Sequence, residues 1–208
     1  MIFSSSKKFV FFAVPKTGTH AVREALRPAL GDDDWEQQML TGRMLSPLPS
    51  IASIGHGHIS HGQLTQAVGP DVIAGYFTFA IVRHPIERFM SVCAFLARTD
   101  PTYTQDPLGW CRAAFERDPF RQRILVRPQT ELLVNAAGEL SIDFIGRHEN
   151  LQADLNSVLT RLDLPEVALQ SRNVTQNEKP ILGGDPAFVR ELEQFYADDF
   201  RLLNFDWD

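Results

Sequence analysis

The sequence has little cysteine and no long apolar run, and each of these absences excludes a class of protein. Cys93 and Cys111 are its two cysteines, and neither belongs to a Cys-x-x-Cys pair, so we expect two reduced thiols. No stretch approaches the roughly 18 to 20 apolar residues of a membrane-spanning helix. The first residues also lack the basic, apolar and small-residue order of a signal peptide. We therefore predict a soluble, cytoplasmic protein without a transmembrane segment.

The chain also lacks an excess of positive charge. It has 20 lysines and arginines against 26 aspartates and glutamates, which gives a formal net charge of -6. Such a chain has no general attraction for nucleic acid or for an anionic membrane, so we predict no nucleic-acid partner. It would also repel a highly sulfated polymer unless its basic residues were gathered in one cleft.

The chain has no internal repeat, and its 208 residues, 44% of them hydrophobic, fit one domain over residues 1–208. Strand-like and helix-like segments alternate, which predicts an α/β fold with a mostly parallel sheet flanked by helices. We expect 35–53 to be irregular and 99–107 to be a loop. The expected strands are 8–14, 76–82, 132–134 and 142–145. The expected helices are 17–30, 60–69, 86–98, 108–117, 151–162 and a last one that opens at Asp185-Pro186.

The stretch from Phe9 to His20 combines a buried strand, a tight turn and a helix start. Six small or apolar residues run into Pro15-Lys-Thr-Gly-Thr19, and an amphipathic segment follows. The first amides of a helix have no internal partners and carry a partial positive charge, so such a turn suits a phosphate or sulfate group. Lys16 adds a point charge, Gly18 allows close approach, and Thr17 and Thr19 add hydroxyl donors. The alternative is a plain strand-to-helix turn with a surface lysine.

This turn is not a Walker loop, because its lysine precedes its only glycine. No acidic residue ends a later strand in a position to hold magnesium, so we predict chemistry without a metal. Strand 76–82 instead runs into Arg83, at the sheet edge where open α/β sheets bind ligands. Arg83 and Ser91, which is two helical turns further on, are candidates to hold a second phosphate. The alternative is a surface ion pair between Arg83 and Glu87.

These motifs carry a family resemblance. Val14-Pro-Lys-Thr-Gly-Thr19 resembles the 5′-phosphosulfate loop of sulfotransferases, and the segment 80–91 resembles their 3′-phosphate motif. Gly55-His-Gly-His58 is similar to the His-x-His segment of family-2 carbohydrate sulfotransferases, such as the heparan sulfate and uronyl 2-O-sulfotransferases. The segments 144–155 and 193–206 resemble later blocks of that group, including a Tyr-x-x-Asp-Phe pattern. The chain thus resembles a bacterial-type member of this family along most of its length.

The resemblance implies a P-loop-like three-layer fold and the donor 3′-phosphoadenosine 5′-phosphosulfate (PAPS), used without a metal. It places Lys16, Thr17, Gly18 and Thr19 on the 5′ group of the donor and places Arg83 and Ser91 on the 3′-phosphate. The chain departs from the family at His20 and Ala21, where relatives usually have hydroxyl residues, and His20 is a candidate substitute donor. Further candidates for phosphate contacts are Arg147, Arg172 and Lys179, and Gln129 resembles a block near the acceptor.

A histidine with a pKa near 6.5 is suited to take the proton of an acceptor hydroxyl at neutral pH. In the matching family segment a histidine is the base, which makes His56 and His58 the candidates. If the segment is extended, the two share a face, so one takes the proton while the other orients the acceptor. The alternatives are a zinc site formed with His61, solvated loop histidines, or a glutamate base at Glu36 or Glu24.

The sequence therefore predicts a PAPS-dependent sulfotransferase. The acceptor hydroxyl attacks sulfur in line, and Lys16 with the helix N-terminus stabilises the charge that builds on the leaving oxygen. The acceptor is a carbohydrate, a lipid head group or a small metabolite, since the acidic balance argues against a long anionic polymer. Two alternatives remain: a P-loop-type nucleotide-dependent kinase and a non-catalytic nucleotide-binding protein of the same fold. The sequence does not indicate an oligomeric state.

Overall fold

The computed structural model describes residues 1–38, 46–169 and 184–207. The chain divides into two compact units, which are described separately below. The first consists of Met1–Val82 and Glu131–Gln170, and the second of Arg83–Thr130 and Ser171–Asp208. The single domain expected over residues 1–208 stays a prediction.

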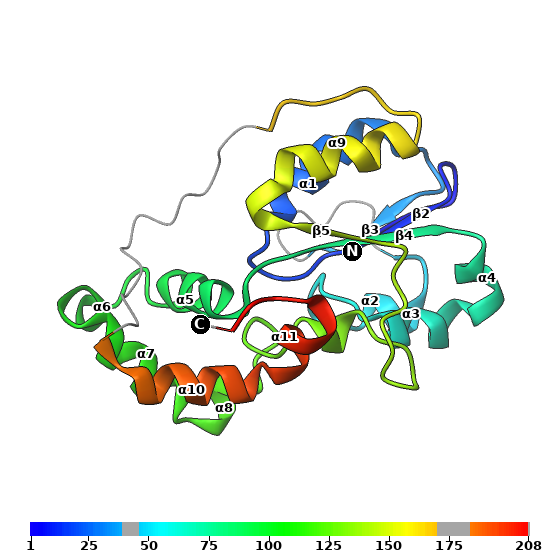
Figure 1. Cartoon of the computed structure of the whole chain (residues 1–208). Helices are drawn as coiled ribbons and strands as arrows, with labels where there is room; N and C mark the ends of the chain where they lie inside the picture. The colour runs from blue at the N-terminus through cyan, green and yellow to red at the C-terminus, as the bar shows by residue number, and fades with distance from the viewer. Residues whose placement is uncertain (39–45, 170–183, 208) are drawn as a thin grey trace. The chain divides into compact units, whose positions relative to one another are not determined.

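The first unit is built on a five-stranded mixed sheet with the strand order β3-β1-β2-β4-β5 (Figure 1). Parallel pairing joins β2 to β4 and β4 to β5, as expected for the α/β fold. Antiparallel pairing adds β1 to β2 and β3 to β1, which the sequence patterns did not indicate. The strands are β1 (Ile2–Ser4), β2 (Phe9–Phe12), β3 (Trp35–Glu36), β4 (Phe77–Val82) and β5 (Phe144–Arg147).

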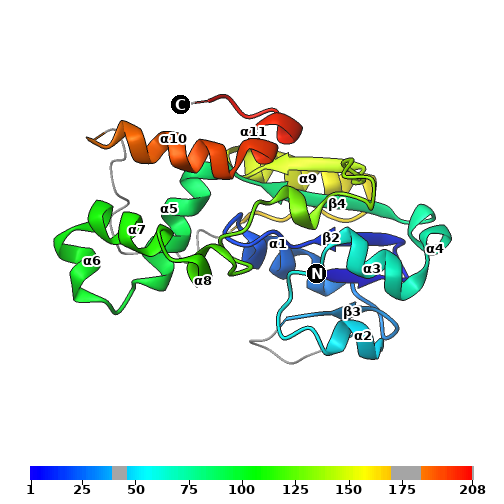
Figure 2. The same cartoon turned by 90° about the horizontal axis from the view of Figure 1, so that it is seen from below.

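Helices cover both faces of this sheet, which gives the first unit three layers. Phe9 and Phe11 of β2 share one apolar cluster with α1 (Thr19–Leu26) and α9 (Leu151–Arg161). Phe12 points to the opposite face, since alternate residues of a strand do so. There its ring lies 5.8 Å from that of His61, the first residue of α3 (His61–Val68). Figure 1 shows α1 and α9 on one side of the sheet and α2 (Pro49–Ala52) with α3 on the other, the side from which Figure 2 is viewed.

Local signals set several of these elements. Ser60 and Gln63 form a capping box at the start of α3, and Gly69 is the C-cap of this helix. Strand β4 is buried from Thr78 onward, as expected for a central parallel strand. The remaining elements of this unit are η1 (Arg27–Ala29), α4 (Pro70–Ala74) and η3 (His148–Asn150). The short helix η2 (Thr130–Leu132) begins at the last residue of a segment of the second unit and continues into this one.

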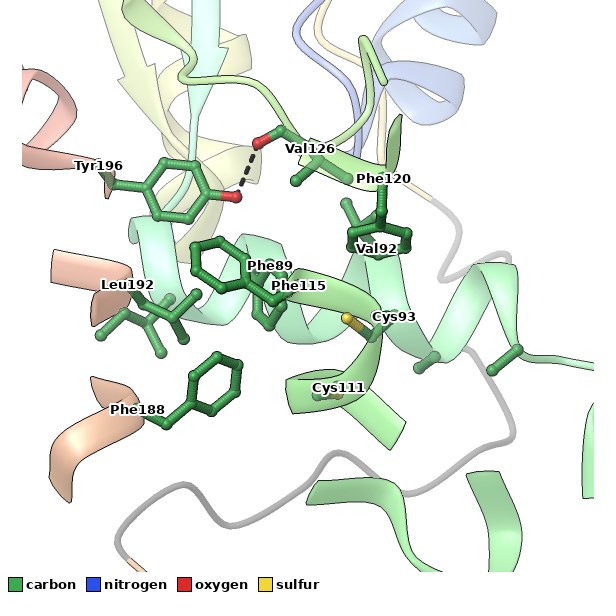
Figure 3. Close-up of a cluster of buried hydrophobic side chains, with 14 of the residues drawn as sticks. Phe89, Val92, Cys93, Cys111, Phe115, Phe120, Val126, Phe188, Leu192 and Tyr196 are labelled. Carbon is green, nitrogen blue, oxygen red and sulfur yellow. Dashed lines mark hydrogen bonds between the residues drawn. The ribbon is translucent and has the colours of Figure 1, made fainter. Parts of the chain in front are cut away.

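The second unit is helical and has its own aromatic core. Figure 3 shows Phe89, Phe115, Phe188 and Tyr196 packed together: the first two come from two different helices, and the other two from a third helix and its C-terminal cap. Cys93 and Cys111 are free thiols buried in this core, and burial raises the pKa of Cys93. Its helices are α5 (Pro85–Leu96), α6 (Pro101–Gln105), α7 (Pro107–Phe115), α8 (Asp118–Arg121), α10 (Pro186–Phe195) and α11 (Ala197–Leu203).

Several sequence predictions about short elements were wrong. Residues 35–53 contain β3 and α2, and the expected loop 99–107 contains α6. The expected strand 132–134 is instead the end of η2, followed by a single bridge between Val134 and Leu140. The last helix is two helices, because the chain leaves α10 at Tyr196 before α11 begins.

Among the described residues, no helix is long and apolar enough to cross a lipid bilayer.

Candidate functional site

The turn after β2 has the backbone of an anion-binding loop. Lys16 and Gly18 both have positive φ angles, of 67° and 86°. Helix α1 begins at Gly18, and in this described part of the chain no side-chain hydrogen bond caps it. The first-turn amides of α1 therefore point out of the helix without a capping side chain, and its dipole favours a negative group there.

Both the available space and the backbone conformation favour glycine at position 18. A Cβ atom at this position would lie 2.7 Å from Cδ2 of Leu151, the first residue of α9. Its φ of 86° is also one that residues with a Cβ rarely adopt. A side chain at this position would therefore have to displace the end of the Leu151 side chain and also adopt a strained backbone conformation.

The neighbouring side chains differ in what they can offer a ligand. Thr17 is fully buried, and its Oγ1 donates to the carbonyl oxygen of Val14 at 2.9 Å. The hydrogen of the Thr17 hydroxyl is therefore used within the loop in this structure, and the contact of Thr17 with an anion stays a prediction. Lys16 and Thr19 are half-buried and His20 is exposed. Desolvation of its ring, with the positive charge of Arg23 nearby, lowers the pKa of His20, so the ring is neutral at neutral pH.

His58 is held at the end of β2 by its ring. Its Nδ1 lies 2.7 Å from the carbonyl oxygen of Ala13, which can only accept a hydrogen bond. Nδ1 therefore carries the proton, and the lone pair of the neutral ring is on Nε2. Burial lowers the pKa of His58 to about 3, and the bond to Ala13 only partly offsets this effect. His58 is thus neutral at pH 7 with its basic nitrogen on Nε2.

His56 has the opposite tautomer. Its Nδ1 accepts a hydrogen bond from the backbone N–H of His58 at 3.3 Å, so in the neutral ring the proton is on Nε2. The two rings lie 6.0 Å apart, and burial lowers the pKa of His56. His61 packs on Phe12 instead. Among the described residues no group of histidine, cysteine or acidic side chains has a metal-binding arrangement, so the zinc alternative gains no support.

A buried ion pair supports the segment that carries the two histidines. Arg23 of α1 contacts Glu36 Oε1 at 2.6 Å and the carbonyl oxygen of Gly57 at 3.3 Å. A Cβ at Gly57 would lie 2.2 Å from the carbonyl oxygen of Gln37, so the segment packs directly on the chain after β3. The glycine between the two histidines is the one local sign of this close packing in the sequence, and no pattern there indicates the contacts of Arg23.

Glu36 and Glu24 are poor candidates for the base in this geometry. Burial raises the pKa of Glu36, but hydrogen bonds from Arg27 and Arg23 outweigh it and the pKa lies below its ordinary value. Both carboxylate oxygens are occupied by these arginines. Glu24 is exposed on α1. The assignment of the base to His58 stays a prediction, and the two glutamates give it no competing support.

The parallel strands bring their carboxyl ends to one edge of the sheet. Phe12 of β2 pairs with Ala80 of β4, and Val82 pairs with Arg147 of β5. The same edge of the first unit therefore contains the turn at residues 14–19, called the anion loop below, the end of β4 and the partly exposed Arg147. This is the edge at which α/β sheets bind ligands. Arg172 and Lys179 lie outside the described residues.

Arg83 follows β4 directly and opens the second unit. Arg83 is 7% exposed, and one of its terminal nitrogens contacts Glu87 at 2.8 Å. This is the ion pair that the sequence offered as the alternative to a phosphate contact. Because Glu87 is exposed, this pair contributes little to stability. Arg83 Nε is buried and has no hydrogen-bond partner among the described residues. Ser91 is also buried, on α5.

Gln129 is fully buried, and its side-chain amide contacts the backbone of Arg83. The resemblance placed it near the acceptor, whereas its amide is already used within the second unit.

A family model described as "Sulfotransferase family" matches residues 1–206, nearly the whole chain. No curated protein and no solved structure matches the chain.

Proposed function

Since the chain belongs to the sulfotransferase family, we propose that it transfers the sulfuryl group of PAPS to the hydroxyl of a carbohydrate or small-molecule acceptor. The observation that carries the proposal is found at the end of β2. There Lys16 and Gly18 lead into the N-terminus of α1, which no side chain caps among the described residues. In the same unit, the neutral ring of His58 is hydrogen-bonded to the carbonyl oxygen of Ala13.

Each unit carries the residues that we assign to one end of this donor. The loop amides, Lys16, Gly18 and Thr19 are the proposed contacts of the 5′ group, with Thr17 shaping the loop through its bond to Val14. Arg83 and Ser91 are the proposed contacts of the 3′-phosphate. The buried Nε of Arg83 supports this assignment, because a buried donor without a partner is costly unless a ligand satisfies it.

The proposed proton path runs through His58. The acceptor oxygen forms a bond to sulfur while the bond from sulfur to the bridging phosphate oxygen breaks, and the hydroxyl proton moves to Nε2 of His58. The other product is adenosine 3′,5′-bisphosphate. Lys16 and the α1 dipole stabilise the negative charge on the leaving oxygen. A pKa of about 3 is low for a general base, but the negative charge of a bound donor would raise the pKa of His58 toward the pH at which the enzyme works.

His56 has the complementary role in this proposal. With its proton on Nε2, it can donate a hydrogen bond to an acceptor oxygen but cannot take a proton there. This assigns the base to His58 and the orienting contact to His56.

Calorimetry tests the proposal against its rivals. We expect binding of adenosine 3′,5′-bisphosphate without magnesium, and weak or no binding of ATP with magnesium. A preference for ATP with magnesium would favour the kinase alternative. Tight bisphosphate binding without sulfate transfer to any pool of hydroxyl acceptors would favour a non-catalytic nucleotide-binding protein.

A further inference from the structure

We infer that Gln129, fixed by Asp199, is a positioning residue that sets Arg83 in place for the 3′-phosphate of the donor. The inference rests on the proposed function and concerns contacts within the second unit alone. Gln129 touches no reacting atom in this scheme and acts through the backbone of Arg83.

The side chain of Gln129 forms two hydrogen bonds to the backbone of Arg83. Its Oε1 accepts from the Arg83 N–H at 2.9 Å, and its Nε2 donates to the Arg83 carbonyl at 2.8 Å. This is the pairing that a neighbouring strand would offer, at the point where β4 ends. The backbone of Arg83 is therefore held on both polar groups, in a site where Gln129 is fully buried.

Asp199 fixes which way the Gln129 amide points. Oδ2 of Asp199 accepts from Gln129 N at 2.9 Å and from Gln129 Nε2 at 3.3 Å. A flipped amide would place Oε1 against this carboxylate, so the orientation is set by the network. Oδ1 accepts from both the amide and the hydroxyl of Thr130, at 2.9 Å each. Every oxygen of the buried carboxylate is thus used to hold residues 129 and 130.

The chain just before Gln129 is held by two further side chains. The buried Arg88 of α5 donates to the carbonyl oxygens of residues 125, 126 and 127, at 2.8, 3.2 and 2.6 Å. The Tyr196 hydroxyl donates to Val126 at 2.7 Å, as Figure 3 shows. Tyr196 and Asp199 are the Tyr-x-x-Asp part of the pattern noted in the sequence, and both contact this one segment. The pattern therefore acts by holding the residues that hold Arg83.

Precise placement matters at Arg83 because of its unsatisfied Nε. One terminal nitrogen is bound to Glu87, and the buried Nε lacks an acceptor among the described residues. A phosphate oxygen would supply that acceptor. Because guanidinium–phosphate bonds depend on the orientation of the planar group, a displaced backbone would weaken them.

Replacing Gln129 by methionine tests the inference, because methionine keeps the volume and removes both bonds. Calorimetry would compare the affinities of wild type and variant for adenosine 3′,5′-bisphosphate and for adenosine 5′-monophosphate, which lacks the 3′-phosphate. We expect the preference for the bisphosphate to fall about tenfold, the loss of about one charged hydrogen bond, with the monophosphate affinity unchanged. Asp199→Asn should show the same selective loss, since its amide would face the donors of Gln129 and Thr130.

Controls separate the possible failures. Phe188→Leu perturbs the core of the second unit without touching the network, so it should lower Tm and leave the ligand preference unchanged. If Gln129→Met does not fold, Gln129→Glu serves, because it keeps the acceptor for the Arg83 amide but removes the donor. A wild-type protein that does not prefer the bisphosphate would overturn the proposed function itself. A wild-type preference that survives in the folded variants, or an equal loss for both ligands, would overturn the positioning role.

Discussion

Nδ1 of His58 lies 2.7 Å from the carbonyl oxygen of Ala13, which immediately precedes the anion loop. One hydrogen bond therefore fixes the tautomer of the proposed base and ties it to the strand that leads into the proposed donor site. Its consequences for catalysis and for acid stability can be measured separately.

The first prediction concerns the base. His58→Asn keeps a donor for Ala13 but removes the basic Nε2, so kcat should fall by about 10²–10⁴-fold with little change in Tm. His56→Asn keeps an acceptor for the His58 amide and should lose less activity. Steady-state kinetics with saturating donor would check both. If the His58→Asn protein keeps its activity, another residue is the base.

The second prediction is the pH dependence of stability. The pKa of His58 is about 3 in the folded protein and near 6.5 when unfolded, so between these values the unfolded state binds the extra proton. Stability from this group is complete above about pH 6.5 and is lost as the pH falls toward 3. The Tm of wild type should therefore fall more steeply between pH 7 and pH 5 than that of His58→Asn. Parallel curves of Tm against pH would show that His58 is not shifted.

The third prediction separates the two ends of the donor site. Lys16→Ala should lower kcat by about 10²–10³-fold, because the positive charge is most useful when charge builds on the leaving oxygen. Arg83→Ala should mainly raise the Kd for adenosine 3′,5′-bisphosphate. Near wild-type turnover of Lys16→Ala would contradict the assignment of the loop.

The fourth prediction concerns Gly18, with Gly138 as a matched control. Both glycines have positive φ, 86° and 78°, but only at Gly18 would a Cβ meet another side chain. Gly138→Ala should cost about 1 kcal/mol from backbone strain alone. Gly18→Ala should cost up to about 1 kcal/mol more and weaken bisphosphate binding, because the end of the Leu151 side chain must move. Adding Leu151→Ala to Gly18→Ala should recover part of the bisphosphate affinity. If the affinity does not recover, the contact between the added methyl group and Leu151 is not the cause of the loss.

The fifth prediction distinguishes structure from catalysis at Glu36. Glu36→Gln leaves the buried Arg23 without its partner charge and should destabilise the protein by about 3–5 kcal/mol, measured by urea unfolding. The exposed Glu24→Gln should change stability by less than about 0.5 kcal/mol. A stable but inactive Glu36→Gln protein would instead make Glu36 the base.

Elements with strong local signals were predictable from the sequence. The helices expected over 60–69 and 86–98 and the strand expected over 76–82 are present, because each depends on residues close in the chain: the capping box at Ser60, Pro85 at the start of α5 and the apolar run of β4. Strands β1 and β3 are three and two residues long, too short for a periodic pattern, and form only because they pair with each other and β2.

The same division holds in the candidate site. The loop after β2 was visible as a motif, but the use of the Thr17 hydroxyl by Val14 was not. The contacts of Arg23 with Gly57 and of Gln129 with Asp199 join residues 34 and 70 positions apart. No local pattern encodes such pairs, because the same residue types are also common at exposed positions that make no such contact.

The parallel pairing of the sheet also bears on how the chain folds as it is synthesised. Strand β2 can pair with β1 early, but its parallel partner exists only when β4 has been made, and one edge of β4 stays unpaired until residues 144–147 follow. Such an edge is a template for pairing with other chains, and contacts between distant residues form slowly. Chains that stop before β5 should therefore aggregate, which makes completion of this edge the vulnerable step in biogenesis.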